Sequence, residues 1–100
     1  MVINVFYDDD VNYVDIIFIP DYIGKDIEDL QEDFFDWLFD ENNNHKYWII
    51  VQGEKVACEY GTQAFVDWIN NKLFKGKKEK VYIIKKNATE WDESNRKLIF

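Results

Sequence analysis

The chain of 100 residues has few of the side chains that most enzymes use for catalysis. Its one cysteine, Cys58, excludes an internal disulfide and any metal site built from several thiolates. The predicted hairpin that carries Cys58 places it near Ile49 and away from His45, the one histidine, so we expect no Cys–His nucleophile pair. Ser94, the one serine, stands in a polar segment, and none of the four glycines belongs to a phosphate-binding loop. We therefore predict a protein that is not an enzyme, has no catalytic residues and binds no cofactor.

One acidic stretch has some likeness to a calcium-binding loop. Asp8, Asp9 and Asp10 are followed closely by Asn12. An EF-hand loop needs Gly at its sixth position and Glu at its twelfth, and the sixth position from Asp8 is Tyr13. We interpret the stretch as an acidic hairpin turn and predict no metal site.

Long apolar runs are also absent. A membrane-spanning helix needs about 20 consecutive apolar residues, and the start of the chain lacks the basic and apolar segments of a signal peptide. We therefore expect a cytoplasmic protein with no membrane contact. The single arginine, Arg96, argues against direct nucleic-acid binding, because arginine makes most base contacts and bidentate phosphate contacts.

Aromatic side chains, in contrast, are abundant. They make up 18% of a chain that is 47% hydrophobic, which excludes the disordered acidic class and fits one domain over residues 1–100. We assign Trp37 and Trp68, on predicted helices, to the core. Trp91 lies in a polar segment, where it is either a lid over the core or an exposed anchor, and both interpretations stay open.

Negative charge is concentrated in one third of the sequence. Residues 8–41 contain thirteen Asp and Glu and one Lys, a net charge of −12, whereas residues 42–100 contain seven acids and eleven Lys or Arg, a net charge of +4. A chain polarised in this way has a field that selects partners of opposite charge. We interpret the lysines of residues 72–86 as solvated side chains of a turn and an edge strand. Self-association of the acidic part with the basic part of a second copy is the alternative.

Hydrophobic periodicity predicts an α+β fold. The predicted strands cover residues 2–7, 13–19, 46–52, 55–60, 80–85 and 97–100, and the predicted helices cover residues 26–41 and a segment from Thr62 to just before Gly76. Asp26 and Thr62 are the predicted N-caps, and Gly53-Glu54 is the predicted hairpin turn. The order is ββαββαβ with a closing strand. It favours a mainly antiparallel sheet with both helices packed on one face.

A short internal similarity links the two predicted helices. The segment Phe34-Phe35-Asp36-Trp37-Leu38 resembles residues 65–69, which lie 31 positions later. One interpretation is a duplicated ββα unit, with copies at residues 1–44 and 45–76. The other is that two amphipathic helices packing on one sheet converge on the same pattern.

The helix predicted at residues 26–41 carries the candidate partner-binding residues. They form an i, i+4 line with a shorter line beside it: Glu28, Glu32, Asp36 and Asp40, with Asp29 and Asp33. Successive members of a line lie ~6 Å apart along the helix axis, close to the roughly 6–7 Å between phosphates of one nucleic-acid strand. Like charges at this spacing destabilise a helix by a few tenths of a kcal/mol per pair. The helix therefore gives up stability to keep the pattern.

Three functional interpretations fit these features. The first is a non-enzymatic acidic binding protein from a phage or mobile element that inhibits or masks a basic protein partner, with its carboxylates acting as a nucleic-acid mimic. The second is an immunity or antitoxin-like protein that neutralises a basic toxin. The third is a housekeeping domain whose acidic face only keeps it soluble. We prefer the first, because charge complementarity accelerates association with a basic partner.

Overall fold

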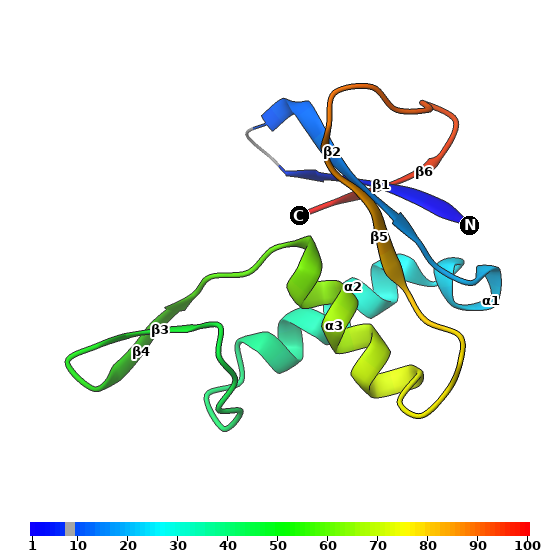
Figure 1. The fold of residues 1–100 in the computed structure, drawn as a ribbon. Coiled ribbons are helices and arrows are strands. Elements are labelled where there is room, and N and C mark those ends of the chain that lie inside the picture. The colour runs from blue at the N-terminus through cyan, green and yellow to red at the C-terminus, as the bar shows by residue number, and fades with distance from the viewer. Residues whose placement is uncertain (8–9) are drawn as a thin grey trace.

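The computed structural model describes residues 1–7 and 10–100. Figure 1 shows its elements, which follow one another in this order: β1 (Val2–Tyr7), β2 (Asp10–Phe18), α1 (Asp21–Gly24), α2 (Ile27–Leu38), β3 (Trp48–Val51), β4 (Glu54–Cys58), α3 (Thr62–Leu73), β5 (Tyr82–Ala88) and β6 (Arg96–Ile99). Asp8 and Asp9 of the predicted acidic turn lie outside the described residues, whereas Asp10 and Asn12 belong to β2, so the second strand begins earlier than predicted.

Four of the strands form the main sheet. Their order is β5-β2-β1-β6, and every pairing is antiparallel except that of β1 with β6. Helices α2 and α3 lie on the same side of this sheet (Figure 1). The predicted α+β class, mainly antiparallel pairing and closing strand are confirmed. The short helix α1 was not predicted, because a single turn after Pro20 has no hydrophobic period to reveal it.

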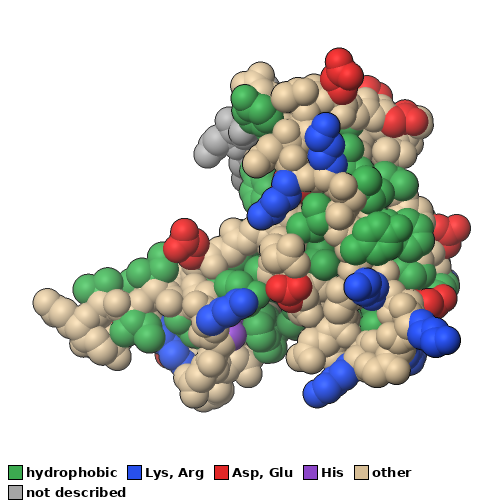
Figure 2. Space-filling model, in the orientation of Figure 1, with side chains coloured by type: hydrophobic (Ala, Val, Ile, Leu, Met, Phe, Trp, Pro, Cys, Tyr) green, Lys and Arg blue, Asp and Glu red, His purple; other side chains and the backbone are tan. Residues whose placement is uncertain are grey.

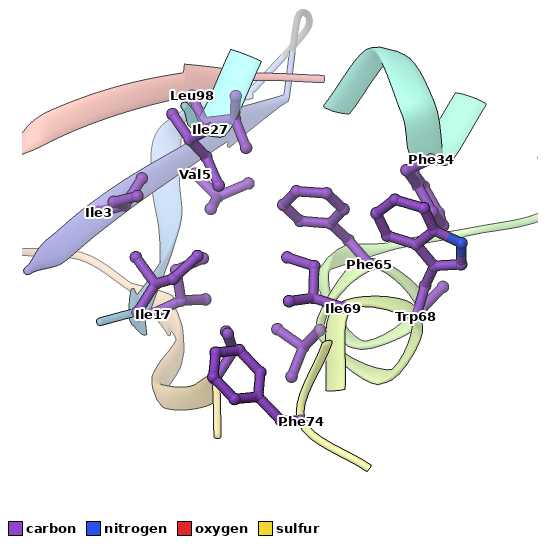
Figure 3. Packing of buried hydrophobic residues seen from close by; sticks show 14 of the residues in the cluster. Ile3, Val5, Ile17, Ile27, Phe34, Phe65, Trp68, Ile69, Phe74 and Leu98 are labelled. Carbon is purple, nitrogen blue, oxygen red and sulfur yellow. The ribbon is translucent and has the colours of Figure 1, made fainter. Parts of the chain in front are cut away.

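The hydrophobic core fills the space between the sheet and the two long helices. Alternation along β1 and β2 directs Ile3 and Ile17 to this side, where both are fully buried. Phe34 of α2 is also fully buried, with its ring centroid 5.3 Å from that of Phe65 and 5.6 Å from that of Trp68 (Figure 3). Because sheet and helices share one cluster, the acidic positions of α2 are left on its outer side.

The connection from β5 to β6 crosses the opposite face of the sheet. Asn4 of β1 is fully buried there and donates from Nδ2 to the backbone oxygen of Asp92 at 2.8 Å. The Trp91 ring meets the Phe6 ring edge-on with centroids 5.8 Å apart. Of the two interpretations of Trp91, the lid is therefore the one the structure supports, although it covers the outer sheet face and not the main core.

Strands β3 and β4 stand apart from the main sheet as a two-stranded arm. They pair only with each other, and the arm projects away from the helices (Figure 1). Its turn residues are Gln52 and Gly53, with φ of 52° and 79°, so the predicted Gly53-Glu54 turn is wrong by one position. Together with a register shift between Ile49 and Ile50, the earlier turn makes Trp48, not Ile49, the partner of Cys58. The duplication of a ββα unit stays a prediction.

One of the two predicted N-caps is confirmed in position and the other is corrected. Asp26 is the N-cap residue of α2, but its side chain makes no cap hydrogen bond, since its φ of −109° and ψ of 29° are not the extended values of a capping residue. The cap position of α3 is Gly61, and Thr62 is already the first helical residue. The Thr62 side chain is drawn instead into a buried polar network described below.

Candidate functional site

The six predicted partner-binding residues are all exposed. In α2 the residues Ile27, Phe34 and Leu38 are buried against the core. The acidic positions between them therefore face solvent, and five of the six belong to the helix itself: Glu28, Asp29, Glu32, Asp33 and Asp36. Sequence periodicity alone was sufficient to predict this face.

The predicted ladder is one residue shorter than expected. Helix α2 ends at Leu38, so Asp40 lies beyond it and does not continue the line from Asp36. Asp40 instead closes a turn. Its backbone oxygen accepts a hydrogen bond from the backbone N–H of Asn43 at 3.0 Å, and its carboxylate accepts one from the backbone N–H of Asn42 at 3.0 Å. The inclusion of Asp40 in the helical line was therefore wrong.

The first member of the ladder is already paired within the chain. Arg96 of β6 forms an ion pair with the Glu28 carboxylate and donates to the backbone oxygens of Gly24 and Lys25. No lysine or arginine among residues 1–7 and 10–100 forms an ion pair with the other four helical acids. These four acids we call the acidic face: Asp29, Glu32, Asp33 and Asp36.

The acidic face carries an electrostatic cost that the helix does not offset. It holds two i, i+4 pairs of like charge, Asp29 with Asp33 and Glu32 with Asp36, and no basic residue lies within α2. Asp36 lies in the last turn, where the negative end of the helix dipole opposes a carboxylate. A partner with positive charge would relieve both effects.

A cleft opens beside the acidic face, between α2, α3 and the root of the arm. Its volume is about 550 Å³, and its lining comes from all three segments: Asp33, Trp37, Lys46, Tyr47, Ala64, Asp67, Trp68, Asn71 and Lys72. Asp33 belongs to both the acidic face and the cleft. We call this hollow the aromatic cleft.

The walls of the aromatic cleft are three aromatic rings. Trp37 is half-buried, and its ring centroid lies 6.5 Å from that of Tyr47 and 6.1 Å from that of Phe34. Trp68 is buried, as predicted, and Lys72 lies over its ring at 4.9 Å. The prediction for Trp37 needs correction, since its ring borders an open hollow as well as the core.

Charged groups of both signs surround these rings. Asp33 and Asp67 supply carboxylates, and Lys46 lies over the Tyr47 ring at 5.4 Å. Burial, with a smaller effect from Asp67, raises the pKa of Tyr47, so its hydroxyl stays protonated and can donate a hydrogen bond. An aromatic wall flanked by carboxylates suits a cationic side chain, because cations are attracted both to ring faces and to negative charge. The sequence contained these residues but no signal that they meet.

A separate polar network is buried where α3 begins. The Thr62 hydroxyl donates to Asp15 Oδ2 at 2.6 Å, so its oxygen accepts from the Tyr7 hydroxyl at 2.7 Å. The backbone N–H of Asn87 donates to the other carboxylate oxygen of Asp15 at 2.9 Å. Burial is the main cause that raises the pKa of Tyr7, which keeps this phenol protonated as the donor. The contacts join three strands of the sheet, β1, β2 and β5, to α3.

His45 and Cys58 come closer together than the sequence predicted. Both bond the same backbone oxygen, that of Leu38, from His45 Nε2 at 2.8 Å and from Cys58 Sγ at 3.4 Å. Asn43 Nδ2 likewise donates to the Trp37 oxygen at 2.9 Å. These side chains satisfy carbonyls left open at the end of α2 and fasten the arm to the helix. Burial raises the pKa of Cys58, which disfavours the reactive thiolate.

No group of three or more His, Cys, Asp or Glu in the described part of the chain could hold a metal ion. In the same part, no helix has the length and apolar character needed to cross a membrane. Comparison of the sequence and the fold with protein-family models, curated proteins and solved structures gives no match.

Proposed function

We propose that this chain is a non-enzymatic binding protein that inhibits or masks a basic protein partner. The acidic face of α2 is the contact surface, and the neighbouring aromatic cleft is its anchor. The observation that carries the proposal is the position of Asp33, which joins four unpaired carboxylates to a hollow walled by Trp37, Tyr47 and Trp68. A face that served only solubility would not need an aromatic hollow beside it.

The two features have complementary effects on binding. Unpaired carboxylates on one helix attract a basic surface and raise its association rate by about 10 to 1,000-fold at low salt. Aromatic side chains in a desolvated hollow slow dissociation, because such residues dominate the binding energy of interfaces. An arginine or lysine of the partner would stack on Trp37 and pair with Asp33 in the cleft.

The acids also support imitation of a nucleic-acid strand. Members of each i, i+4 pair are ~6 Å apart along the axis, close to the roughly 6–7 Å phosphate spacing. The partner would then be a nucleic-acid-binding enzyme, with this protein in its binding channel. We place both in the cytoplasm, where an unpaired thiol such as Cys58 stays reduced, and propose a phage or mobile element as the source.

A pair of charge-matched variants tests the proposal. Glu32→Lys with Asp36→Lys alters the acidic face, and Glu90→Lys with Glu93→Lys changes the net charge equally at exposed positions elsewhere. The tagged chain is used to capture partners from host extract, followed by mass spectrometry and affinity measurement. We expect the first variant to bind a basic partner with an affinity lower by 100-fold or more, and the second variant to lose less than about tenfold in affinity. Equal losses of affinity in the two variants would show that the acidic face acts only through the net charge of the protein. No loss of affinity in either variant would overturn the proposal.

Competition identifies the mode of binding. If duplex DNA displaces the protein from its captured partner, the carboxylates occupy a nucleic-acid channel. If a saturating concentration of duplex does not displace the protein, the nucleic-acid-mimic interpretation is wrong. The acids then match a basic surface of another kind, as in an immunity protein.

A further inference from the structure

The arm formed by β3 and β4 exposes more aliphatic surface than its size explains. Ile49, Ile50, Val51 and Val56 are 39%, 60%, 52% and 56% exposed. Their exposed fractions together equal about two whole aliphatic side chains. Apolar side chains lie along the arm in Figure 2. An isolated two-stranded hairpin is marginally stable, and a third strand is usually needed for independent stability.

The outer edge of β3 has backbone groups free to pair with another strand. In an antiparallel pair only alternate residues of a strand bond its neighbour. The two-residue turn makes Val51 and Glu54 a bonded pair, so the groups of Ile50 and Trp48 point to the open edge. These four residues of β3, Trp48–Val51, include no charge and no proline. Such an edge readily pairs with another strand.

Every other open edge in the described structure has features that oppose pairing. β5 carries Lys85 and Lys86, and β6 carries Lys97. β4 carries Glu54 and Lys55, and its register shifts opposite Ile49 and Ile50, which marks a bulge. Charges and bulges are the usual protection of sheet edges. β3 is therefore the edge at which an added strand meets least resistance.

We propose that β3 pairs antiparallel with β3 of a second copy of this chain, joining the two arms into one four-stranded sheet. A twofold axis beside Ile49 satisfies the outward backbone groups, because it sets Trp48 opposite Ile50 of the second copy and Ile50 opposite the second Trp48. The same register sets Tyr47 opposite the second Val51. Each side chain at the centre of the pairing therefore meets an apolar or aromatic one.

Charge complementarity identifies a second copy as the occupant. Antiparallel arms place the tip of one beside the root of the other. Glu54 is at the tip and Lys46 is at the root; both are exposed, and neither forms an ion pair with a described residue. The symmetry creates this tip-to-root pairing twice. The pairing surface excludes the four acids of α2, and it shares with the aromatic cleft only Lys46 and Tyr47 at the root of the arm.

Sedimentation equilibrium of the full chain from micromolar to millimolar concentration tests the pairing. We expect a monomer–dimer equilibrium that Ile50→Lys weakens by tenfold or more. Ile84→Lys, at an isoleucine of β5 that is 50% exposed, is the matched control and leaves the equilibrium unchanged. A parent chain that stays monomeric at 1 mM, or an unaltered dimer in Ile50→Lys, overturns the proposal. Species larger than dimers also overturn it, because twofold pairing is closed.

A charge exchange tests the register. Lys46→Glu and Glu54→Lys each place like charges together twice, and each is expected to weaken the dimer about tenfold. The double variant restores opposite charges and returns the dissociation constant to within about threefold of the parent. In amide hydrogen exchange, the Trp48 and Ile50 protons gain protection as concentration rises. A double variant that stays as weak as the single variants overturns the antiparallel arrangement.

The same measurements separate this pairing from partner binding. Glu32→Lys with Asp36→Lys is expected to leave the dimer intact. If this variant abolishes the dimer, the contact is instead a head-to-tail one between the acidic and basic parts of two copies. That result would overturn the arm proposal and leave the acidic face as a binding surface.

Discussion

The buried network around Thr62 makes a stability prediction that does not depend on function. Thr62→Val keeps the shape of the side chain and removes only its hydroxyl. Thr62 is 1% exposed, and its hydroxyl donates to Asp15 and accepts from Tyr7. The substitution thus removes one hydrogen bond to a charged group and one between neutral groups, with no cavity to complicate the result.

The size of the effect follows from these two bonds. A hydrogen bond to a charged group contributes about 1.5–3 kcal/mol, and a neutral one about 0.5–1.5 kcal/mol. The Asn87 amide still bonds Asp15 after the change, so part of the carboxylate remains satisfied. We expect Thr62→Val to lower the free energy of unfolding by about 2–4 kcal/mol. For a domain of this length that corresponds to roughly 10–30 °C in Tm.

Urea unfolding followed by tryptophan fluorescence measures the effect. The midpoint should fall while the slope stays constant, because the surface exposed on unfolding is unchanged. Thr62→Ser retains the hydroxyl and should cost less than half as much. Tyr7→Phe should cost about 1 kcal/mol alone and almost nothing on top of Thr62→Val, since its bond is then already lost. If Thr62→Val cost no more than Thr62→Ser, the network would not stabilise the fold.

Three further outcomes are expected. Cys58 should react with iodoacetamide more slowly than a free thiol at pH 8, and the difference should narrow as pH rises, because burial raises its pKa and lowers the thiolate fraction at a given pH; equal rates at pH 8 would contradict this. Asp36→Asn should stabilise the chain by about 0.3–0.8 kcal/mol in thermal unfolding, since it removes an i, i+4 repulsion and an unfavourable dipole contact; a loss of stability would show that Asp36 has an intramolecular partner. Trp91→Phe should change the free energy of unfolding in urea by less than about 1 kcal/mol despite the lost ring area. The reason is that the buried Trp91 Nε1 has no hydrogen-bond partner among the described residues, so its removal relieves an unsatisfied donor. Trp68→Phe in the core should lower the free energy of unfolding by more.

The acidic face and the arm make different demands on solution conditions. Screening by salt weakens attraction between the acidic face and a basic partner. Backbone pairing and aliphatic burial along β3 do not rest on charge, so salt weakens the dimer only through its Lys46–Glu54 pairs. A salt titration of the two equilibria therefore provides a simple check that the surfaces act separately.

Periodicity predicted α2 and its exposed acids because both depend on residues within a few turns of one another. Phe34 and Leu38 mark the buried side at helical spacing, and the acids occupy the remaining positions. The helix end was less predictable. Asp36 was expected to continue to Asp40, but the chain turns after Leu38, where Asn43 and His45 bond the last carbonyls. Those bonds come from outside the helix, so the helical pattern could not reveal them.

The hydrophobic and charge patterns by themselves determined the α+β class, the element order and the exposure of the acidic face. Only the tertiary structure decided which acids are unpaired, since Arg96 reaches Glu28 across 68 positions. It also buried Asp15 beside Thr62, 47 positions away, and set the β3–β4 arm apart from the sheet. The reason is physical: periodicity records which side of an element faces the core, whereas ion pairs, clefts and free edges depend on which elements meet, and that is settled by packing between distant segments.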